Sequence, residues 1–476
     1  MASNEHSANG NSHGAPLPPA TPEELNEDLI HEARRVGPRM RTLLIIFGSL
    51  FTLAFVGAGM RLASGTDDHT VWRYYAVCYF FVFSLTAGIP LAAIGLRMAR
   101  AQWRKPTSRL AEMFLILGPM HVIFFIPLLA GAPPITGTEP PHNTMWMDWQ
   151  LGPWLPDIIM VSTLAITGLG LLYASALPDL AAVRDHAADG TTKSWARRVA
   201  RGWSGTDRQW RMHKSALGIL GAFYVAMYAM THFSFSTDFA ISMVPGWKDP
   251  IFPAFHAVSG LQMGLGLFIV SMFLLRKVHG LGRYFELEQF WGFSRLLLVL
   301  TLFWFYFWWS AFILFWYGRL PHEQSIIALL IFGDPAESAL LARPQFLMFA
   351  GAIGLSFIIP FLVIMWNPVR RSIVGPTIVG LVIISGGLFD RLRIYSNTWS
   401  VEQVGGHALE EVPAFAVPDI WDAAFFVGLL SGVPFLILLA SRVIPIVSLW
   451  ETREALMMRV VRPFGIGNAH VVGKPD

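Results

Sequence analysis

Ten apolar segments, each close to 20 residues long, are the feature of this sequence that most restricts its fold. An α-helix needs about 20 apolar residues to cross the hydrocarbon core of a bilayer, and a strand of a membrane barrel needs about half that number. Lipid offers no hydrogen-bond partners, so continuous runs of this length predict membrane-spanning helices. The segments lie at 42–62, 74–96, 111–129, 156–177, 213–230, 255–275, 293–315, 345–366, 375–392 and 425–446.

The composition also indicates an all-α integral membrane protein. Charged residues make up 14% of the chain, whereas soluble domains contain about 25%. The 36 Phe and 18 Trp suit a lipid-embedded body with aromatic belts. Cys78 is the only cysteine, which excludes a disulfide framework, a Cys-ligated zinc or iron–sulfur site and a CxxCH haem attachment in this chain. We therefore expect any redox centre to be an organic molecule, a His-ligated haem or a group in a partner subunit.

Basic residues predict the orientation of the helices. When the loops are assigned alternately to two sides, all but seven of the 35 Lys and Arg fall on the side of the N-terminus. The positive-inside rule then places both termini in the cytoplasm, and an even number of spans is needed for this distribution. We expect the basic loops to face anionic lipid headgroups and not nucleic acid. The seven residues on the opposite, outer side are Arg61, Arg73, Lys248, Arg319, Arg343, Arg391 and Arg393.

The regions outside the spans are predicted to be tails. Residues 1–40 are polar and rich in Ser, Asn, Pro and Glu, which predicts a disordered cytoplasmic N-terminal tail. No charged, apolar and small-residue cleavage pattern precedes the first apolar run, so we expect no secretory signal peptide. The ten-helix membrane domain is predicted to occupy 41–450, and a cytoplasmic C-terminal tail 451–476.

One outer connection, 231–256, concentrates ionisable residues between two spans in the sequence THFSFSTDFAISMVPGWKDPIFPAFH. Ionisable groups at membrane depth are costly and are therefore functional candidates. His232 is suited to acid–base chemistry near neutral pH, and a nearby carboxylate such as that of Asp238 can hold its tautomer. The alternative interpretation is an interfacial turn at 245–247 with solvated neighbours.

Asp157 begins the fourth span on the same outer side, followed by Ser162 and Thr163. It is either a first-turn partner of the helix dipole or the acceptor of a proton from a substrate at the outer surface. We predict two sets of functional residues near this surface. The predicted catalytic residues are Asp157, His232 and Asp238, and the predicted cofactor-binding residues are Thr86, Trp247 and His256.

Further polar residues inside the spans are candidates for a proton path. Glu112 and His121 share the third span but lie on roughly opposite faces, and Glu112 alternatively pairs with Arg109. Asp390 and Arg391 close the ninth span, where adjacent opposite charges are expected to form interhelical ion pairs. An aromatic run at 303–316 either packs helices together or offers a stacking surface to a flat ring. The residues predicted to line the path are Glu112, His121, Ser162, Thr163 and Asp390.

Several stretches, in this order and spacing, carry a family resemblance over about 72–455. They are WRKPTSRLAE (103–112), PDLAAVRDHA (178–187), RGWSG (201–205), HFSFSTDFAISMVPGW (232–247), IFP (251–253), SAFILFWYG (310–318) and SRVIPIVSLWE (441–451). The chain resembles the polysulfide-reductase-type membrane subunits of the NrfD/PsrC family. Within that family it is most similar to the ten-span quinol-oxidising subunit of alternative complex III. Asp157 precedes Pro178 by 21 residues and His232 precedes Asp238 by six, as in the family.

The resemblance implies a fold and an activity. The fold is two four-helix bundles with two flanking helices in a bacterial inner membrane. The activity is that of a subunit of a quinol:cytochrome c-type oxidoreductase, which oxidises menaquinol or ubiquinol near the periplasmic face. Electrons would leave through a partner iron–sulfur subunit to a multihaem cytochrome c, because such members bind no haem or iron–sulfur cluster themselves. A second NrfD-like membrane subunit and proton translocation are implied as well.

Two alternatives stay open. Thr86, in the sequence LTAG, stands where the family usually has a histidine that holds the quinone carbonyl. The third span ends LLAGAPP, without the family's His-Leu-Gly-Arg. These departures favour a structural NrfD-like paralogue that anchors such a complex without quinone turnover. A cytochrome b-type subunit or a transporter is the third interpretation. The sequence disfavours it, because a bis-His haem needs facing histidines within the spans and His232 and His256 lie at helix ends. No repeated halves typical of a transporter are evident either.

Overall fold

The computed structural model describes residues 38–134, 142, 144–145, 154–186, 191–200, 202–278, 280–333, 339–464 and 467–472. The first half of this part contains α2 (Pro38–Ala63), η1 (His69–Trp72), α3 (Arg73–Ala87), α4 (Pro90–Met98), η2 (Gln102–Thr107), α5 (Ser108–Met113), η3 (Phe114–Leu117), α6 (Gly118–Ala130), α7 (Leu155–His186), α8 (Thr191–Val199), α9 (Asp207–Ser236) and η4 (Thr237–Ile241). The predicted tail at 1–40 lies outside the described residues, apart from the first turn of α2.

The second half begins with α10 (Phe252–Val278), η5 (Leu281–Arg283), α11 (Leu287–Gly318), α12 (Pro321–Ile327), η6 (Ala328–Phe332), η7 (Leu340–Ala342), α13 (Pro344–Ile353), η8 (Gly354–Ile358), α14 (Ile359–Ile364), α15 (Asn367–Arg370), α16 (Val374–Arg391), η9 (Leu392–Ser396), α17 (Ile420–Ala440) and α18 (Leu449–Met457). An antiparallel hairpin of β1 (Arg459–Phe464) and β2 (Gly467–Val472) follows. The predicted boundary of the C-terminal tail at residue 450 therefore falls inside α18.

The described residues contain nine helical runs that are long and apolar enough to cross a membrane, which defines a multi-pass membrane architecture. They coincide with nine of the ten predicted segments. The remaining segment, 375–392, lies in α16, which ends on the charged pair Asp390 and Arg391. Its uncharged part is therefore shorter than a full crossing of the hydrocarbon core.

Prolines explain where three of these runs are interrupted. Proline lacks the N–H that continues the helical ladder and clashes with the preceding turn. Pro90 begins α4 after a break from α3, Pro119 lies at the start of α6 after the 3₁₀ turn η3, and Pro360 follows the π turn η8. These three segments are therefore apolar along their whole length, but their backbone departs locally from a regular α-helix.

Helices α2 and α17 pack as an antiparallel pair, and glycines permit their close approach. A Cβ on Gly428 would lie 2.1 Å from the backbone N of Ala54. At one end of the pair, the Nη2 of Arg61 lies 2.7 Å from the Oδ2 of Asp422. The start of α2 and the end of α17 consequently lie at the same end of the helical body.

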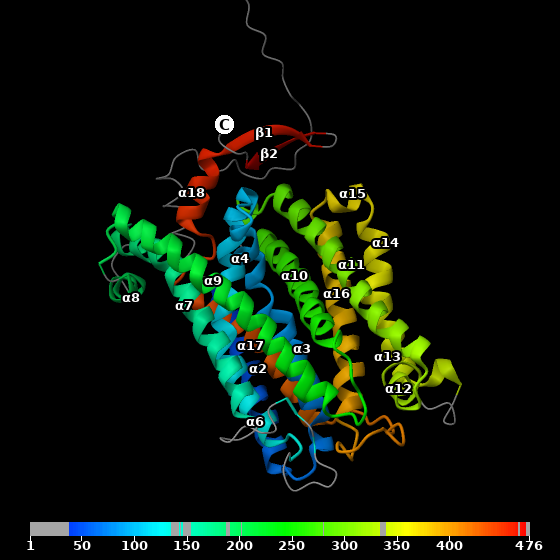
Figure 1. Cartoon of the computed structure of the whole chain (residues 1–476). Helices are drawn as coiled ribbons and strands as arrows, with labels where there is room; N and C mark the ends of the chain where they lie inside the picture. The colour runs from blue at the N-terminus through cyan, green and yellow to red at the C-terminus, as the bar shows by residue number, and fades with distance from the viewer. Residues whose placement is uncertain are drawn as a thin grey trace, which may run out of the picture.

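The remaining helices form two groups around α10. On one side, α7 packs against α6 and α9, and α3 contacts α6 and α10. On the other side, α10 packs against α11 and α16, and α13 packs against α16. Figure 1 shows these helices running side by side, with α18, β1 and β2 at one end. We call that end the basic end, and the end with Arg61 and Asp422 the outer end.

The connections predicted to lie on the outer side pack onto one another at the outer end. The indole N–H of Trp399 donates to the carbonyl of Phe239 at 2.9 Å. The Nε2 of His69 lies 2.8 Å from the carbonyl oxygen of Val401. Connections that are far apart in the sequence therefore form one layer over the helix ends.

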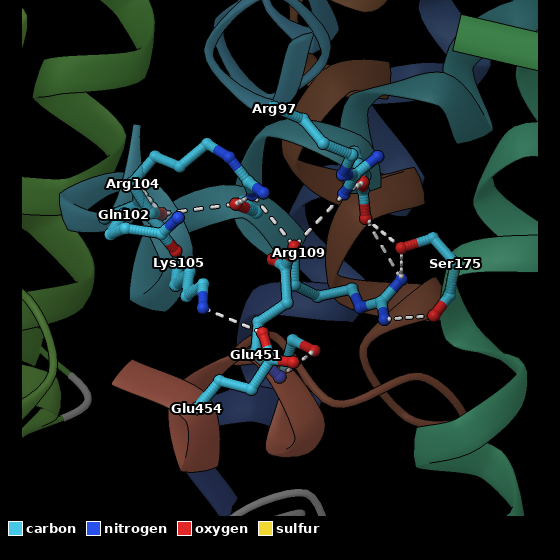
Figure 2. Close-up of polar contacts among 12 residues, drawn as sticks. Arg97, Gln102, Arg104, Lys105, Arg109, Ser175, Glu451 and Glu454 are labelled. Atoms are coloured by element: carbon cyan, nitrogen blue, oxygen red, sulfur yellow. Dashed lines mark hydrogen bonds and ion pairs between the residues drawn. The ribbon is translucent and has the colours of Figure 1, made fainter. Parts of the chain in front are cut away.

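Ion pairs hold α18 against the basic end (Figure 2). The carboxylate of Glu451 accepts from Arg104 at 2.8 Å and pairs with Arg97 at 3.4 Å. The Oδ1 of Asp179 accepts from the backbone N–H of Leu449 at 3.1 Å, at the start of α18. Burial by itself raises the pKa of Glu451, but the charges of Arg104 and Arg97 outweigh it and lower this pKa to about 2.

We expect Glu451→Gln to lower the free energy of unfolding by about 3 kcal/mol at neutral pH, because Arg104 and Arg97 lose a buried partner. In the parent protein this contribution is complete above the pKa of an exposed glutamate, about 4.3. It is lost as the pH falls from there toward 2, because protonation removes the carboxylate. Thermal unfolding in detergent, followed by tryptophan fluorescence against pH, measures both effects.

The control is Glu454→Gln on the same helix. Its carboxylate pairs with Lys105 at 2.8 Å, but its side chain is 42% exposed, so its loss is expected to cost less than about 1 kcal/mol. Equal effects of the two substitutions would contradict a dominant role for Glu451.

Candidate functional site

A small cavity lies within the first helix group. Helices α3, α6, α7 and α9 and the turn η3 contribute to its walls. Most of its lining is apolar, and the ionisable groups are the imidazole of His121 and the phenol of Tyr224. The lining residues are Phe83, Ala87, Phe114, Leu115, Gly118, His121, Val161, Leu164, Ala165, Gly168 and Tyr224.

Thr86 and His121, predicted for different roles, are hydrogen-bonded to each other. The Oγ1 of Thr86 lies 3.0 Å from the Nε2 of His121 and 2.7 Å from the carbonyl oxygen of Val82, to which it donates. Because a hydroxyl has a single proton to donate, the Nε2 of His121 carries the proton of their bond. In a neutral His121 the Nδ1 therefore carries no proton and can accept one. His121 is one of the residues that line the cavity.

Asp157 lies on the face of α7 that lines this cavity. Val161, Leu164 and Ala165 line it, and their spacing of four, seven and eight residues from Asp157 keeps all of them on one helix face. The Asp157 carboxylate is fully buried and accepts a hydrogen bond from the Ser234 hydroxyl of α9. The structure therefore places Asp157 between α7 and α9.

Asp238 lies close enough to Asp157 to interact with it electrostatically. Its side chain is fully buried in the π turn η4, and its Oδ1 accepts from the backbone N–H of Met145 at 2.7 Å. Two carboxylates that share a buried region repel each other strongly, because little water screens them. Uptake of a proton by the pair relieves that repulsion, so the pair can act as a proton acceptor.

His232 belongs to a different network from the two aspartates. Its Nδ1 lies 2.8 Å from the Nδ1 of His256, whose Nε2 lies 2.8 Å from the hydroxyl of Tyr395. All three side chains are fully buried. The expected carboxylate partner of His232 is thus replaced by a second imidazole. Phe83 connects this chain to the cavity, because its ring centroid lies 5.4 Å from that of His232 and 5.1 Å from that of His121.

Asp390 and Arg391 differ from the predicted interhelical ion pair. The Oδ2 of Asp390 pairs with Arg391, its neighbour in the chain, at 2.8 Å, and the Oδ1 pairs with Arg393 at 2.8 Å. The link between helices is made by hydrogen bonds instead. Arg391 donates to the hydroxyl of Ser84 in α3 at 3.2 Å and to the carbonyl of His256 in α10 at 3.2 Å.

Trp247 lies at a second small cavity, in the second helix group. Asp249 and Arg393 are its charged lining residues. Burial raises the pKa of the Asp249 carboxyl, although hydrogen bonds from the backbone N–H groups of Ile251 and Phe252 oppose this. The predicted cofactor-binding residues therefore lie in three places: Thr86 beside the first cavity, His256 in the histidine network and Trp247 at the second cavity. The lining residues are Trp247, Asp249, Phe252, Phe255, Trp308, Ala311, Phe312, Phe315, Ile326, Ile327, Leu330, Ile331 and Arg393.

Three residues predicted for the proton path lie apart from these clusters. Glu112 is buried at the basic end, where it forms ion pairs with Arg97 and, at 3.2 Å, with Arg109. The alternative interpretation of Glu112 as an ion-pair partner of Arg109 is therefore confirmed. Ser162 and Thr163 are half-buried on α7, and neither hydroxyl makes a hydrogen bond within the part of the chain that the structure describes.

The sequence prediction missed Tyr395, Ser234 and Arg393. Tyr395 and Arg393 are positioned by the π turn η9, which continues α16 beyond the predicted span. The available signal was that Arg391 and Arg393 are two of the few basic residues on the outer side. Ser234 gave no signal, since its importance depends on which side of α9 faces Asp157. Within the described ranges, no three His, Cys, Asp or Glu side chains are close enough to hold a metal ion.

Comparison with models of known protein families finds no match, and comparison with curated proteins finds none either. The class of this protein is therefore defined by its own apolar helices, as a multi-pass membrane protein. The first cavity combines a mostly apolar lining with the imidazole of His121, and it lies on the face of α7 that carries Asp157.

Tyr395→Phe tests the histidine network. The substitution leaves the Nε2 of His256 buried without its partner, so we expect the free energy of unfolding to fall by about 1–3 kcal/mol. Thermal unfolding in detergent measures the change. Tyr306→Phe is the control, because Tyr306 is 61% exposed on α11. A Tyr395→Phe protein as stable as the control would show that the hydrogen bond carries no stability.

Proposed function

We propose that this protein is the quinol-oxidising membrane subunit of an electron-transfer complex in a bacterial inner membrane. In this proposal ten spans form two four-helix bundles with two flanking helices, and both termini are cytoplasmic. The observation that carries the proposal is the position of the first cavity. It is lined by the imidazole of His121, adjoins Asp157 one turn along α7, and reaches His232 through Phe83.

The cavity has the properties that a quinol head group requires. Its lining is mostly apolar with few polar groups, which is typical of small-molecule sites. His121 offers a base at Nδ1, and Thr86 orients it by accepting from Nε2. Thr86 itself contacts no ligand in this arrangement, since its hydroxyl is occupied by His121 and Val82.

Proton removal is the task that this chain's own residues perform. A quinol that is oxidised loses two electrons and two protons. His121 accepts one proton at Nδ1, and the pair of Asp157 and Asp238 accepts the other toward the outer end. Groups of this kind typically contribute about 10²–10⁴-fold to a rate. The fully buried His232 and His256 are hydrogen-bonded to each other beside Phe83. In this proposal they form a second route for protons.

The electrons require a partner. The chain has one cysteine, Cys78, which is buried. We therefore propose that electrons pass to a periplasmic iron–sulfur subunit and then to a multihaem cytochrome c. The family resemblance supports this pairing, and it also supports a second NrfD-like membrane subunit and coupled proton translocation. The layer of connections at the outer end offers a surface for such a subunit.

A structural paralogue without quinone turnover is the competing function. The bond between Thr86 and His121 favours it, because the position that holds the quinone carbonyl in the family is here engaged in the protein's own hydrogen bonds. The two functions differ in whether residues of the first cavity affect turnover.

Asp157→Asn tests the proposal in the purified complex. We expect quinol:acceptor turnover to fall about a hundredfold while assembly is retained, because an amide keeps the Ser234 contact but accepts no proton. Asp207→Asn, at the exposed opposite end of α9, is the matched control and should leave turnover unchanged. Turnover at the parental rate in Asp157→Asn would contradict the assigned role.

Val161→Phe tests the cavity itself. The larger side chain fills the space that a quinol ring would occupy, so turnover is expected to be lost. Ile159→Phe adds the same volume at a position that is 50% exposed on the same helix, and it should have no effect. Absence of quinol turnover already in the parental complex, with an intact iron–sulfur subunit, would favour the structural function.

A further inference from the structure

The arginines at the basic end fall into two groups that differ in their partners. In the first helix group, Arg97, Arg104 and Arg109 are each paired with a buried carboxylate. In the second helix group, Arg295 of α11 and Arg370 of α15 form no ion pair with a carboxylate in the part of the chain that the structure describes. The second helix group therefore keeps positive charge that these residues do not neutralise.

Arg295 and Arg371 lie against the same indole ring. The Cζ of Arg295 is 3.9 Å from the centroid of the Trp291 ring, and the Cζ of Arg371 is 6.0 Å from it. Trp291 precedes Arg295 by one turn of α11, and a long side chain on a helix points back toward the N-terminus. The ring therefore holds the guanidinium of Arg295 in one place, by a cation–π contact, before any ligand arrives.

Arg370 is linked to these two arginines through the backbone, where α15 contacts α11 at the basic end (Figure 1). Its carbonyl oxygen accepts from the hydroxyl of Ser294, the residue before Arg295, at 3.4 Å. Its Nη2 donates to the side-chain oxygen of Asn367, whereas its Nε is buried and has no hydrogen-bond partner among the described residues. A buried donor without an acceptor is costly, so an acceptor oxygen supplied from outside would stabilise this arrangement.

The length of α11 places Arg295 at the level of lipid headgroups. The helix has 32 residues, which span about 48 Å, whereas the hydrocarbon core of a bilayer is about 30 Å thick. A centred α11 therefore extends about 9 Å beyond the core at each end. Arg295 lies about 12 Å from the first residue of α11. Its side chain, which points back along the helix, therefore reaches the boundary between hydrocarbon and headgroups.

The face of α11 that carries Arg295 continues as an exposed apolar surface. Val299, Leu302 and Phe303 are exposed on it, and their spacing of four, seven and eight residues from Arg295 keeps them on one side of the helix. Next to α15, Trp366 is also exposed, as is typical of a tryptophan at the membrane interface. A cationic site above an apolar surface fits an amphiphile with an anionic head and acyl chains.

Charge and hydrogen-bond geometry decide which headgroup fits. Neighbouring guanidinium groups repel one another, and an anion between them relieves that repulsion. A guanidinium group can donate two parallel hydrogen bonds to the oxygens of a phosphate, which makes arginine a preferred phosphate ligand. A phosphatidylcholine headgroup offers the same phosphate but adds a quaternary ammonium, which the arginines repel. The site therefore favours a phosphodiester that carries a net negative charge.

We propose that Arg295, Arg370 and Arg371 bind the phosphate of one anionic phospholipid in the leaflet at the basic end, and that its acyl chains lie along the exposed face of α11. The ligand connects α11 to α15, two segments that are far apart in the sequence. The sequence predicts only a general attraction of basic loops to anionic headgroups, whereas the geometry assigns one defined site. This site does not depend on the proposed quinol oxidation.

Native mass spectrometry of the full-length protein in detergent, titrated with dioleoyl phosphatidylglycerol, tests the site. We expect one phosphatidylglycerol to bind about tenfold more tightly than phosphatidylcholine with the same acyl chains, because only phosphatidylglycerol is anionic. Arg295→Gln is expected to remove this preference. Arg208→Gln removes an exposed charge at the start of α9. It should keep the preference, and it measures the general attraction of the basic end.

Arg295→Lys separates the guanidinium group from the charge. The variant keeps a positive charge at the boundary and is expected to fold as the parent does. It loses the paired hydrogen bonds to phosphate, so the preference for phosphatidylglycerol should fall to about threefold. A preference in Arg295→Lys equal to that of the parent would contradict the assigned guanidinium contact.

Two outcomes would overturn the site itself. One is a preference for phosphatidylglycerol that is the same in Arg295→Gln as in the parent, because the attraction would then be spread over the basic end. The other is displacement of the bound phosphatidylglycerol by millimolar inorganic phosphate, which would show that the arginines hold a free anion and not a lipid.

Discussion

The buried carboxylate of Asp390 is the interaction on which the rest of the structure depends. A charge at membrane depth must be paired, because little water is available to solvate it. Asp390 pairs with both Arg391 and Arg393. Arg391 then reaches Ser84 in α3 and the carbonyl of His256 in α10. One ion cluster thereby fixes three helices relative to one another and places the two histidines in contact.

The two helix groups carry different kinds of cavity around this cluster. The first is apolar with a single imidazole, and it adjoins carboxylates that can take up protons. The second is aromatic, and the buried indole N–H of Trp247 in its lining has no hydrogen-bond partner among the described residues. The fully buried chain of His232, His256 and Tyr395 lies between them.

The two ends of the helical body are built for different tasks. At the basic end, carboxylates pair with Arg97, Arg104 and Lys105 (Figure 2). Two of these carboxylates, those of Glu451 and Glu454, belong to α18. These ion pairs balance the positive charges and hold α18 against the basic end. At the outer end the carboxylate of Asp157 accepts from the Ser234 hydroxyl, and that of Asp238 accepts from the backbone N–H of Met145.

The sequence by itself determined the spans, because hydropathy over about 20 residues depends on composition alone, and it also predicted which connections share an end. It identified Asp157, Asp238, His232 and His256 as polar residues of one face. The tertiary structure decided their partners: Thr86 bonds His121, Glu112 pairs with arginines, and Trp247 lines a second cavity. The physical reason is helix rotation. A turn of one residue moves a side chain by about 100° around the axis, and only packing between distant segments sets that angle.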